Sequence, residues 1–191
     1  MIYKTQDKEG MRLNMQVIKY IMLFFVFISA SLIGKMVAKK YTYRVQELEE
    51  MKNALNVFKS KIKFTYEPIP EIFEEIEKNT VNSTDMCANK NIANIFSLAR
   101  MKMETESAEI AWKEAIYESQ NNLNSEDKQA LSMLSKMLGQ TDVDGQTSQI
   151  EITQNFLGVQ IKQALEEKQK NEKLYARLGT TIGLVIVIIL I

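Results

Sequence analysis

The chain has 191 residues, with 24 basic and 24 acidic side chains and therefore no formal net charge. It contains no histidine, one cysteine, seven glycines and two prolines. The small number of glycines and prolines disfavours a β-sandwich or barrel, which needs many turns. The absence of histidine removes the commonest general base and metal ligand. A single cysteine forms neither an internal disulfide nor a zinc cluster. The composition predicts an all-α, non-enzymatic protein without a cofactor.

Apolar residues are concentrated at the two ends of the chain, where residues 20–34 and 178–191 carry no charge. Each run is shorter than the ~20 residues that a helix needs to cross a bilayer. Flanking lysine and arginine side chains can reach the headgroups while their stems remain in apolar surroundings, which lengthens the usable helix. The sequence therefore predicts an N-terminal extension over 1–15, a transmembrane helix over 16–38 and a C-terminal transmembrane segment over 176–191.

A cleaved secretory signal peptide is the alternative interpretation of the first segment. Basic residues precede a short apolar run that contains Ser29-Ala30-Ser31, as in such peptides. Lys35 and the basic pair at 39–40 follow directly, and positive charge there resists translocation. We therefore expect a retained anchor. The second segment is also preceded by basic residues: Lys170, Lys173 and Arg177. This charge pattern places the central domain in the cytoplasm, with both termini across the membrane.

Residues 39–175 are expected to form a cytoplasmic helical bundle of about six helices. The first helix continues out of the membrane segment, and its apolar residues recur at steps of three and four: Tyr41, Val45, Leu48, Met51, Leu55, Phe58 and Ile62. Charged residues are expected to lie away from this stripe: Lys40, Glu47, Glu50, Lys59 and Lys61. The helix should end near Tyr66, because Pro68 and Pro70 disfavour helical conformation in the residues before them.

Further helices are expected over 71–78 and 88–103, from Ser107, over 125–138, and from about Asp144 to Gly179. Asn124 or Ser125 would open the fifth helix and Gly139 would end it. The core candidates of these helices include Ile72, Phe73, Ile76, Ile92, Ile95, Phe96, Ile110, Ala111, Trp112, Ala115, Ile116, Phe156 and Leu157. Residues 166–173 are all charged or amide, so we expect them to bridge the gap between domain and bilayer instead of packing on the domain.

No motif in the chain points to an active site. Neither a P-loop nor a G-x-G-x-x-G sequence occurs, so no phosphate cradle is expected. Adjacent carboxylates such as Glu74-Glu75 and Glu166-Glu167 are expected on solvated helix faces. Cys87 has no histidine to activate it, and is expected to be a buried or bystander thiol. Residues 39–177 carry 19 basic and 22 acidic side chains, which gives no electrostatic footprint for nucleic acid.

Residues 140–151 match the spacing of a calcium-binding EF-hand loop. Asp142 and Asp144 fall at positions three and five, Gly145 at position six and Glu151 at position twelve. Position one is Gln140, and without its carboxylate one of the main charges on the cation is missing. We therefore favour a loop in which Asp142 or Asp144 caps the last helix, and we expect no metal site.

Both apolar segments contain small residues four positions apart, the spacing that lets helix backbones approach closely. These residues are Ala30 and Gly34 in the first segment and Gly179 and Gly183 in the second. With the domain on one side of an antiparallel pair, both motifs lie at the same membrane face. We expect them to pack together as a hairpin or against the equivalent helices of a neighbouring subunit; the alternative is that small residues are merely tolerated there.

Several short motifs follow one another along residues 20–191. Leu32-Ile33-Gly34 is followed by Ala38-Lys39-Lys40-Tyr41, then by Ala111-Trp112. Leu138-Gly139 precedes Asp142 and Gln146, and a long helix leads to Lys173-Leu174-Tyr175-Ala176-Arg177-Leu178-Gly179 before the terminal apolar run. In this order the motifs resemble the stage III sporulation protein AB family of endospore-forming bacteria, whose motif loop corresponds here to Leu138, Gly139, Asp142 and Gln146.

The resemblance implies a function that composition does not specify. It implies an integral-membrane platform or scaffold subunit of the secretion-like channel complex between mother cell and forespore, with a helical domain similar to the cytoplasmic domain of type II secretion protein F. The implied location is the mother-cell membrane around the forespore. The implied partners are the membrane, a cytoplasmic assembly ATPase (stage III sporulation protein AA) and other membrane proteins of the complex, with a homo-oligomer also compatible and no nucleic acid.

Two other classes of function stay open at this stage. One is a membrane-anchored regulatory adaptor that binds a cytoplasmic partner. The other is a hydrolase, which would require carboxylates from different helices to meet in one pocket.

Overall fold

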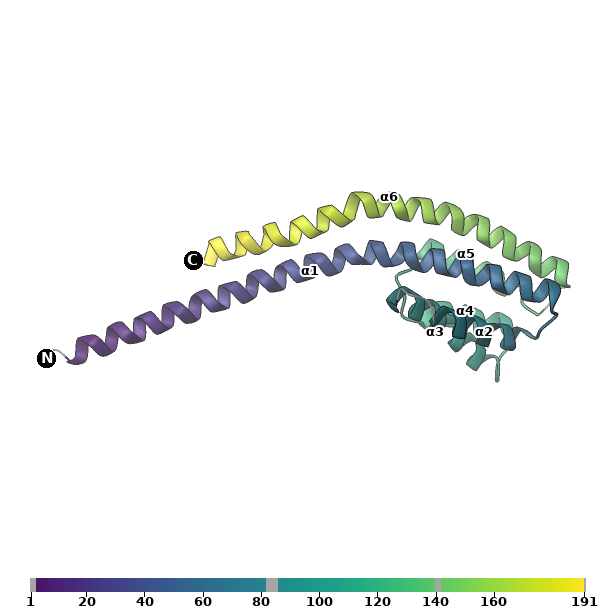
Figure 1. Ribbon diagram of the computed structural model, residues 1–191, viewed down its shortest axis with the longest axis horizontal. Coiled ribbons are helices and arrows are strands. Elements are labelled where there is room, and N and C mark those ends of the chain that lie inside the picture. The colour runs from purple at the N-terminus through teal and green to yellow at the C-terminus, as the bar shows by residue number, and fades with distance from the viewer. Residues whose placement is uncertain (1–2, 82–85, 140–141, 191) are drawn as a thin grey trace. The chain divides into compact units, whose positions relative to one another are not determined.

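The computed structural model describes residues 3–81, 86–139 and 142–190, and these residues form six α-helices and no β-strand (Figure 1). The helices are α1 (Tyr3–Phe64), α2 (Ile69–Val81), α3 (Met86–Lys102), α4 (Ala108–Glu118), α5 (Ser125–Ser135) and α6 (Val143–Leu190). The predicted all-α fold is confirmed. The chain divides into two compact units, one formed by Met1–Lys39 with Gln169–Ile191 and the other by Lys40–Lys168. Helices α1 and α6 contribute to both units.

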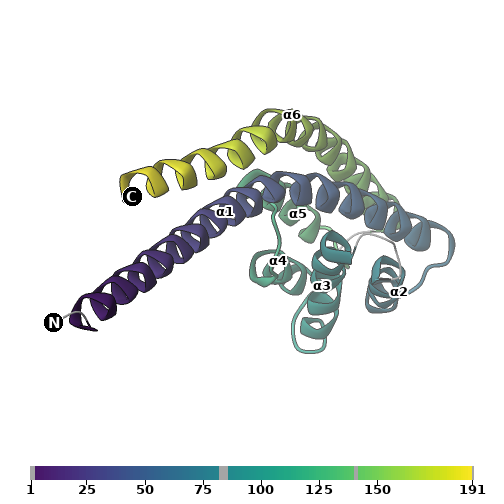
Figure 2. The ribbon, with the colours of Figure 1, turned by 60° about the vertical axis from the view of Figure 1, so that its left-hand side comes forward.

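The unit of residues 40–168, which we call the domain, has a closed apolar core. All residues of the predicted α1 stripe except the half-buried Tyr41 are buried in it. In both views α1 lies between α6 and the short helices α2–α4 (Figures 1 and 2). Four aromatic rings meet at the centre, with ring centroids 5.1–5.4 Å apart. These rings belong to Phe58, Phe73, Phe96 and Trp112, and the Trp112 indole N–H donates to the carbonyl oxygen of Leu131 at 2.9 Å.

Helix ends in the domain follow local sequence signals. α1 ends at Phe64, and Tyr66 takes a left-handed conformation (φ 55°) just before Pro68. Ser107 caps α4 through its side chain, and the helix begins at the next residue, where the sequence predicted a start. Asn124 caps α5 by accepting the N–H of Asp127 at 2.8 Å, and the Asp127 carboxylate accepts the N–H of Asn124 at 2.9 Å. This reciprocal capping box satisfies two backbone donors that a helix start otherwise leaves unpaired.

The predicted end of α5 and the predicted burial of two residues are wrong. α5 ends at Ser135, not at Leu138, because the N–H groups of Met137 and Leu138 bond to carbonyls three residues earlier and tighten the chain into turns. Gly139 follows with a positive φ of 72°. Ile110 and Phe156, expected in the core, are 48% and 44% exposed, because each lies at the edge of its helix's apolar face.

The second unit consists of the N-terminal part of α1 and the C-terminal part of α6. Both helices are long and apolar enough to cross a membrane, and only 17% and 6% of their most apolar 18-residue windows are buried. Large side chains are correspondingly open, with Phe25 64% and Ile189 76% exposed. We call this unit the apolar helix pair. Exposed apolar surface on this scale marks contact with a membrane or another protein.

Candidate functional site

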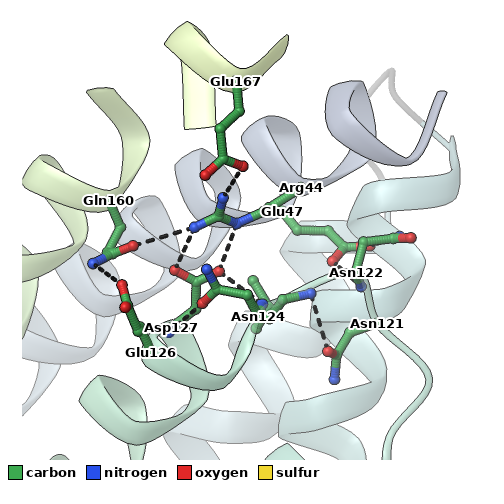
Figure 3. Close-up of polar contacts among 10 residues, drawn as sticks. Arg44, Glu47, Asn121, Asn122, Asn124, Glu126, Asp127, Gln160 and Glu167 are labelled. Atoms are coloured by element: carbon green, nitrogen blue, oxygen red, sulfur yellow. Dashed lines mark hydrogen bonds and ion pairs between the residues drawn. The ribbon is translucent and has the colours of Figure 1, made fainter. Parts of the chain in front are cut away.

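The most elaborate polar site of the domain is built around Arg44 of α1 (Figure 3). The Arg44 guanidinium is almost fully buried, and so is the carboxylate of Asp127 on α5. Arg44 Nε donates to Asp127 Oδ2 at 2.8 Å and Nη2 donates to Oδ1 at 3.1 Å. This two-point contact matches the planar fork of the guanidinium to the two carboxylate oxygens, which makes it stronger and more directional than a single ion pair.

The same guanidinium also reaches α6. Arg44 Nη1 donates to Glu167 Oε2 at 2.7 Å, and Nη2 donates to Gln160 Oε1 at 3.2 Å. Gln160 Nε2 in turn donates to Glu126 Oε2 of α5 at 3.4 Å. Arg44 therefore ties α1, α5 and α6 together within the domain. Glu167 belongs to the polar run 166–173, so the expectation that this whole run stays off the domain is wrong at that residue.

Neighbouring carboxylates stabilise the positive charge of Arg44. Burial lowers the pKa of Arg44, but the hydrogen bonds and negative charges of Asp127 and Glu167 outweigh burial and raise the pKa above its ordinary value. A buried charge of this kind is tolerated because its partners are in place, and removal of one partner leaves the other charge buried alone. The Arg44 site is consequently a point at which the packing of three helices depends on one side chain.

A second buried carboxylate, Glu47, lies one turn along α1. It is fully buried and accepts hydrogen bonds from Asn91 Nδ2 at 2.7 Å, from the Asn122 backbone N–H at 2.6 Å and from Asn122 Nδ2 at 2.7 Å. Glu47 thus fastens α3 and the loop before α5 to α1. Burial raises the pKa of Glu47, and the three donors from the asparagines only partly oppose this. Glu47 was expected only to lie away from the apolar stripe, and the structure buries it beside that stripe.

The raised pKa of Glu47 predicts a pH dependence of stability. Because the folded state binds the proton more tightly than the unfolded state, the stabilisation is complete below the unfolded pKa of about 4.5 and is lost as the pH rises through the folded pKa. We expect the free energy of unfolding of the wild type, relative to Glu47→Gln, to fall as the pH rises above 4.5. Urea unfolding of the wild type and of Glu47→Gln at a series of pH values measures this difference in stability. A difference that stays constant with pH would contradict the burial of the Glu47 carboxylate.

Beside these networks lies a pocket of about 250 Å³ lined by Lys40, Tyr41, Arg44, the loop 121–124 and Glu167. The lining residues Arg44 and Glu167 bind each other, and Arg44 also binds the buried Asp127 beside the pocket. Among the described residues, no group of three or more Cys, Asp and Glu side chains is placed to hold a metal ion. Cys87 lies in the first turn of α3, and the structure does not describe its side chain. The arrangement of the described charged groups is suited to fixing helices.

The family-motif residues surround the connection from α5 to α6. Leu138 is buried in the core, and Gly139 uses its positive φ to turn the chain. Asp142 Oδ1 accepts the N–H of Gly145 at 3.0 Å, and the N–H of Gln146 donates to the Asp142 carbonyl at 3.0 Å. Asp142 is therefore the N-cap of α6, as the favoured interpretation predicted. Residues 143–151 are helical, so Asp144 and Glu151 are not in a calcium-loop conformation; Gln140 lies outside the described residues.

Within the apolar helix pair, the structure brings the four small residues of the two motifs together. A Cβ atom added to Gly34 would lie 2.6 Å from the Cα of Gly179, and one added to Gly179 would lie 3.0 Å from the carbonyl oxygen of Ala30. A Cβ atom added to Gly183 would lie 3.2 Å from that of Ala30. No side chain fits between these backbones, so the close contact of α1 and α6 here requires glycine at both central positions.

The sequence offered a signal for Arg44 that its apolar periodicity obscured. Arg44 lies three residues after Tyr41 and four before Leu48, so it falls inside the helix face that becomes buried. A charge in that register requires an opposite charge in the core. The Asn124–Asp127 spacing marked the capping box, but nothing in the sequence assigned the Asp127 carboxylate to Arg44.

Comparisons with known proteins give a consistent result. The family model described as stage III sporulation protein AB matches residues 19–191. Stage III sporulation protein AB of Bacillus subtilis (strain 168) is 22% identical over 170 residues, covering 87% of this chain and 95% of that protein. A solved structure of stage III sporulation protein AB (SpoIIIAB) has a similar fold, with a TM-score of 0.57 and 16% identity over 67% of this chain and 98% of that one. This chain belongs to the stage III sporulation protein AB family.

Proposed function

We propose that this protein is a non-enzymatic platform subunit of the membrane complex that links mother cell and forespore during sporulation. The observation that carries the proposal is the contrast between its two units. The domain buries its apolar residues in one core, whereas the apolar helix pair leaves Phe24, Phe25 and Ile188 more than 60% exposed. A chain of this family with such a pair is suited to hold a helical domain at a membrane surface.

The anchor in this proposal consists of two membrane-spanning segments, 16–38 and 176–191, which form a hairpin. The close contact of Gly34 with Gly179 supports it, because small residues at the crossing allow backbone packing where a bilayer offers no hydrophobic driving force. The cytoplasmic part of the chain in this proposal is residues 39–175, which include the domain, and both chain ends lie across the membrane. The family-motif loop from Leu138 to Gln146 sets the start of α6, the helix that leads back to the anchor.

The non-enzymatic part of the proposal is supported by how the buried charges are used. Asp127 and Glu167 come from different helices, as a hydrolase would require, but both carboxylates are bound to Arg44. An acid–base pair needs one carboxylate free to take a proton at working pH. The Arg44 site instead holds three helices in register, which is the task of a rigid scaffold.

The proposed partners are a cytoplasmic assembly ATPase, stage III sporulation protein AA, and other membrane proteins of the channel complex, at the mother-cell membrane around the forespore. The domain would position the ATPase as the cytoplasmic domain of type II secretion protein F is expected to do in its own machine. Further copies of the chain are compatible with this arrangement. A regulatory adaptor is the alternative function.

Crosslinking in sporulating cells tests the proposal. A photoreactive residue is placed at exposed positions of the domain, such as Glu49 on α1 and Met133 on α5, and the captured chains are identified by mass. The scaffold proposal expects capture of the ATPase and of membrane proteins of the complex. Capture of a soluble signalling protein with neither of these would favour the adaptor and contradict the platform function.

The glycine crossing makes a prediction of its own. Gly34→Ala forces the helix backbones apart and is expected to destabilise the pair by roughly 1–3 kcal/mol, the range for overpacking. The readout uses Ala30→Cys and Gly183→Cys in a Cys87→Ser chain, since their Cβ positions lie 3.2 Å apart, near the distance that a disulfide spans. Mild oxidation should give an intrachain disulfide, and Gly34→Ala should reduce its yield.

Gly158→Ala is the matched control for Gly34→Ala. Gly158 lies on α6 in the domain, and a Cβ atom added there meets only the flexible end of Lys52 at 3.7 Å. The control should leave the disulfide yield unchanged and stabilise the domain by about 0.5–1 kcal/mol. Equal yields from the Gly34→Ala and Gly158→Ala chains would refute the close crossing, and a disulfide-linked dimer would assign the contact to neighbouring subunits.

A further inference from the structure

Five basic residues cluster beside the glycine crossing of the apolar helix pair, and we call them the basic collar: Lys35, Lys39, Lys170, Lys173 and Arg177. All five are exposed. Lys35 and Lys39 come from α1, and the other three from α6. None of the five has a carboxylate within 4.0 Å among the residues that the structure describes. Five cations without an ion-pair partner are therefore available to a ligand.

The crossing fixes the height of the collar on the helix pair. Gly34 meets Gly179 while Gly183 meets Ala30, so the two helices run antiparallel. Residues that follow Gly34 and residues that precede Gly179 consequently lie on the same side of the crossing. With a rise of ~1.5 Å per residue, Lys39 lies about 7.5 Å and Lys170 about 13.5 Å from the crossing along the helices. All five charges fall within about 14 Å of the crossing along the helices.

The collar residues also form ordered stripes on their helices. Lys35 and Lys39 are four residues apart, and Lys170, Lys173 and Arg177 follow at steps of three and four. These spacings place each set on one helix face. Glu172 is the only acidic residue in 35–39 and 169–177. Next to the collar, residues 20–34 and 178–191 carry no charge, so an uncharged, largely exposed apolar surface adjoins a strongly positive one.

We infer that the basic collar binds the phosphate groups of anionic phospholipids in the membrane leaflet that faces the domain. The inference rests on the proposed function in one respect, namely that the apolar helix pair enters a bilayer. If it does, the collar lies at the headgroup level, because the charge-free segments begin within one residue of it. Lys and Arg clusters directly beside a membrane helix attract anionic headgroups, and each cation near such a surface contributes about fivefold in binding, which corresponds to ~1 kcal/mol.

Lipid selectivity of the full chain tests the inference. The protein is reconstituted in phosphatidylcholine vesicles that contain either spin-labelled phosphatidylglycerol or spin-labelled phosphatidylcholine, and the immobilised fraction gives the ratio of association constants. The wild type is expected to prefer phosphatidylglycerol by at least about fivefold, and 0.5 M salt should reduce the preference by screening. Lys170→Gln/Lys173→Gln/Arg177→Gln removes the three cations of α6 and should lower the preference by at least about fivefold. Lys35→Gln/Lys39→Gln removes the two cations of α1 and should also lower the preference.

The matched control removes the same number of charges from the domain. Lys113→Gln/Lys136→Gln/Lys162→Gln changes three exposed lysines and should leave the lipid preference unchanged. An equal loss in this control, or an unchanged preference in both collar variants, overturns the inference. Carbonate extraction of the same vesicles separates the two levels of the proposal. A wild type that resists extraction but shows no lipid preference overturns the collar alone, whereas a wild type that is extracted contradicts both the anchor and the collar.

Discussion

Replacing Arg44 with methionine is expected to lower the free energy of unfolding of the full chain by about 3–5 kcal/mol. Methionine fills a similar space but leaves the Asp127 carboxylate, which is fully buried, without its partner. Glu167 and Gln160 lose their contacts at the same time. The free energy of unfolding of Arg44→Lys should lie between those of the wild type and Arg44→Met, because lysine keeps the charge but cannot make the two-point contact with Asp127. Urea unfolding in mild detergent, followed by circular dichroism, measures these differences.

Lys59→Met is the matched control for Arg44→Met. Lys59 is also on α1 and also pairs with a residue of α6, Glu151, at 3.3 Å, but both side chains are substantially exposed. An exposed ion pair contributes roughly 0–1 kcal/mol, so the control should change stability little. The double variant Arg44→Met/Asp127→Leu should recover part of the loss, because it removes the unpartnered charge, although the capping box is lost. Similar losses for Arg44→Met and Lys59→Met would contradict a buried three-helix tie.

Trp112→Ala is expected to destabilise the domain by about 3–5 kcal/mol. Trp112 is fully buried, and its ring lies 5.4 Å from that of Phe73 and 5.2 Å from that of Phe96. Alanine leaves a cavity among these rings and removes the hydrogen bond to the Leu131 carbonyl. Trp112→Phe keeps an aromatic ring and should lose about 1–3 kcal/mol. Circular dichroism follows unfolding of both variants, since the chain has no other tryptophan.

The control for Trp112 lies two residues earlier on the same helix. Ile110 is 48% exposed, so Ile110→Ala should change the free energy of unfolding by no more than about 0.5 kcal/mol. If the two alanine variants differed little in stability, the aromatic cluster would not be the centre of the core.

Much of the domain followed from local patterns in the sequence. The α1 stripe from Val45 to Ile62 was predictable because a 3.6-residue period of apolar residues has one geometric outcome, a helix with one buried face. The end of α1 before Pro68 and the starts of α4 and α5 were predictable because proline and capping side chains act within a few residues. Asp142 as the N-cap of α6 belongs to the same class of local signal.

The polar site of the domain could not be predicted in this way. The position of Arg44 on the apolar face of α1 indicates burial, but the helical pattern identifies neither its partners nor the burial of Glu47. The partners of these two residues lie 44 to 123 residues away in the sequence. Whether a carboxylate is buried depends on which loop folds over it, and for Glu47 that is the asparagine loop before α5. The same holds for Glu167, whose polar neighbours indicate a bridge to the bilayer although its carboxylate binds Arg44.

The small residues of the apolar segments fall between these cases. Their spacing indicated close helix packing but left open whether the partner was in the same chain or in a neighbouring one. In the structure Gly34 contacts Gly179 of its own chain.

Side-specific labelling tests the membrane hairpin, the central claim of this account, most directly. Single cysteines replace Lys162 in the domain or Leu190 near the end of α6, in a chain with Cys87→Ser. The chains are produced in non-sporulating cells, where the far side of the membrane is the cell exterior, and these intact cells receive a membrane-impermeant maleimide. A hairpin with a cytoplasmic domain predicts labelling of Leu190→Cys in intact cells, and of Lys162→Cys only after the membrane is permeabilised. Labelling of Lys162→Cys in intact cells, or protection of Leu190→Cys until permeabilisation, would contradict it.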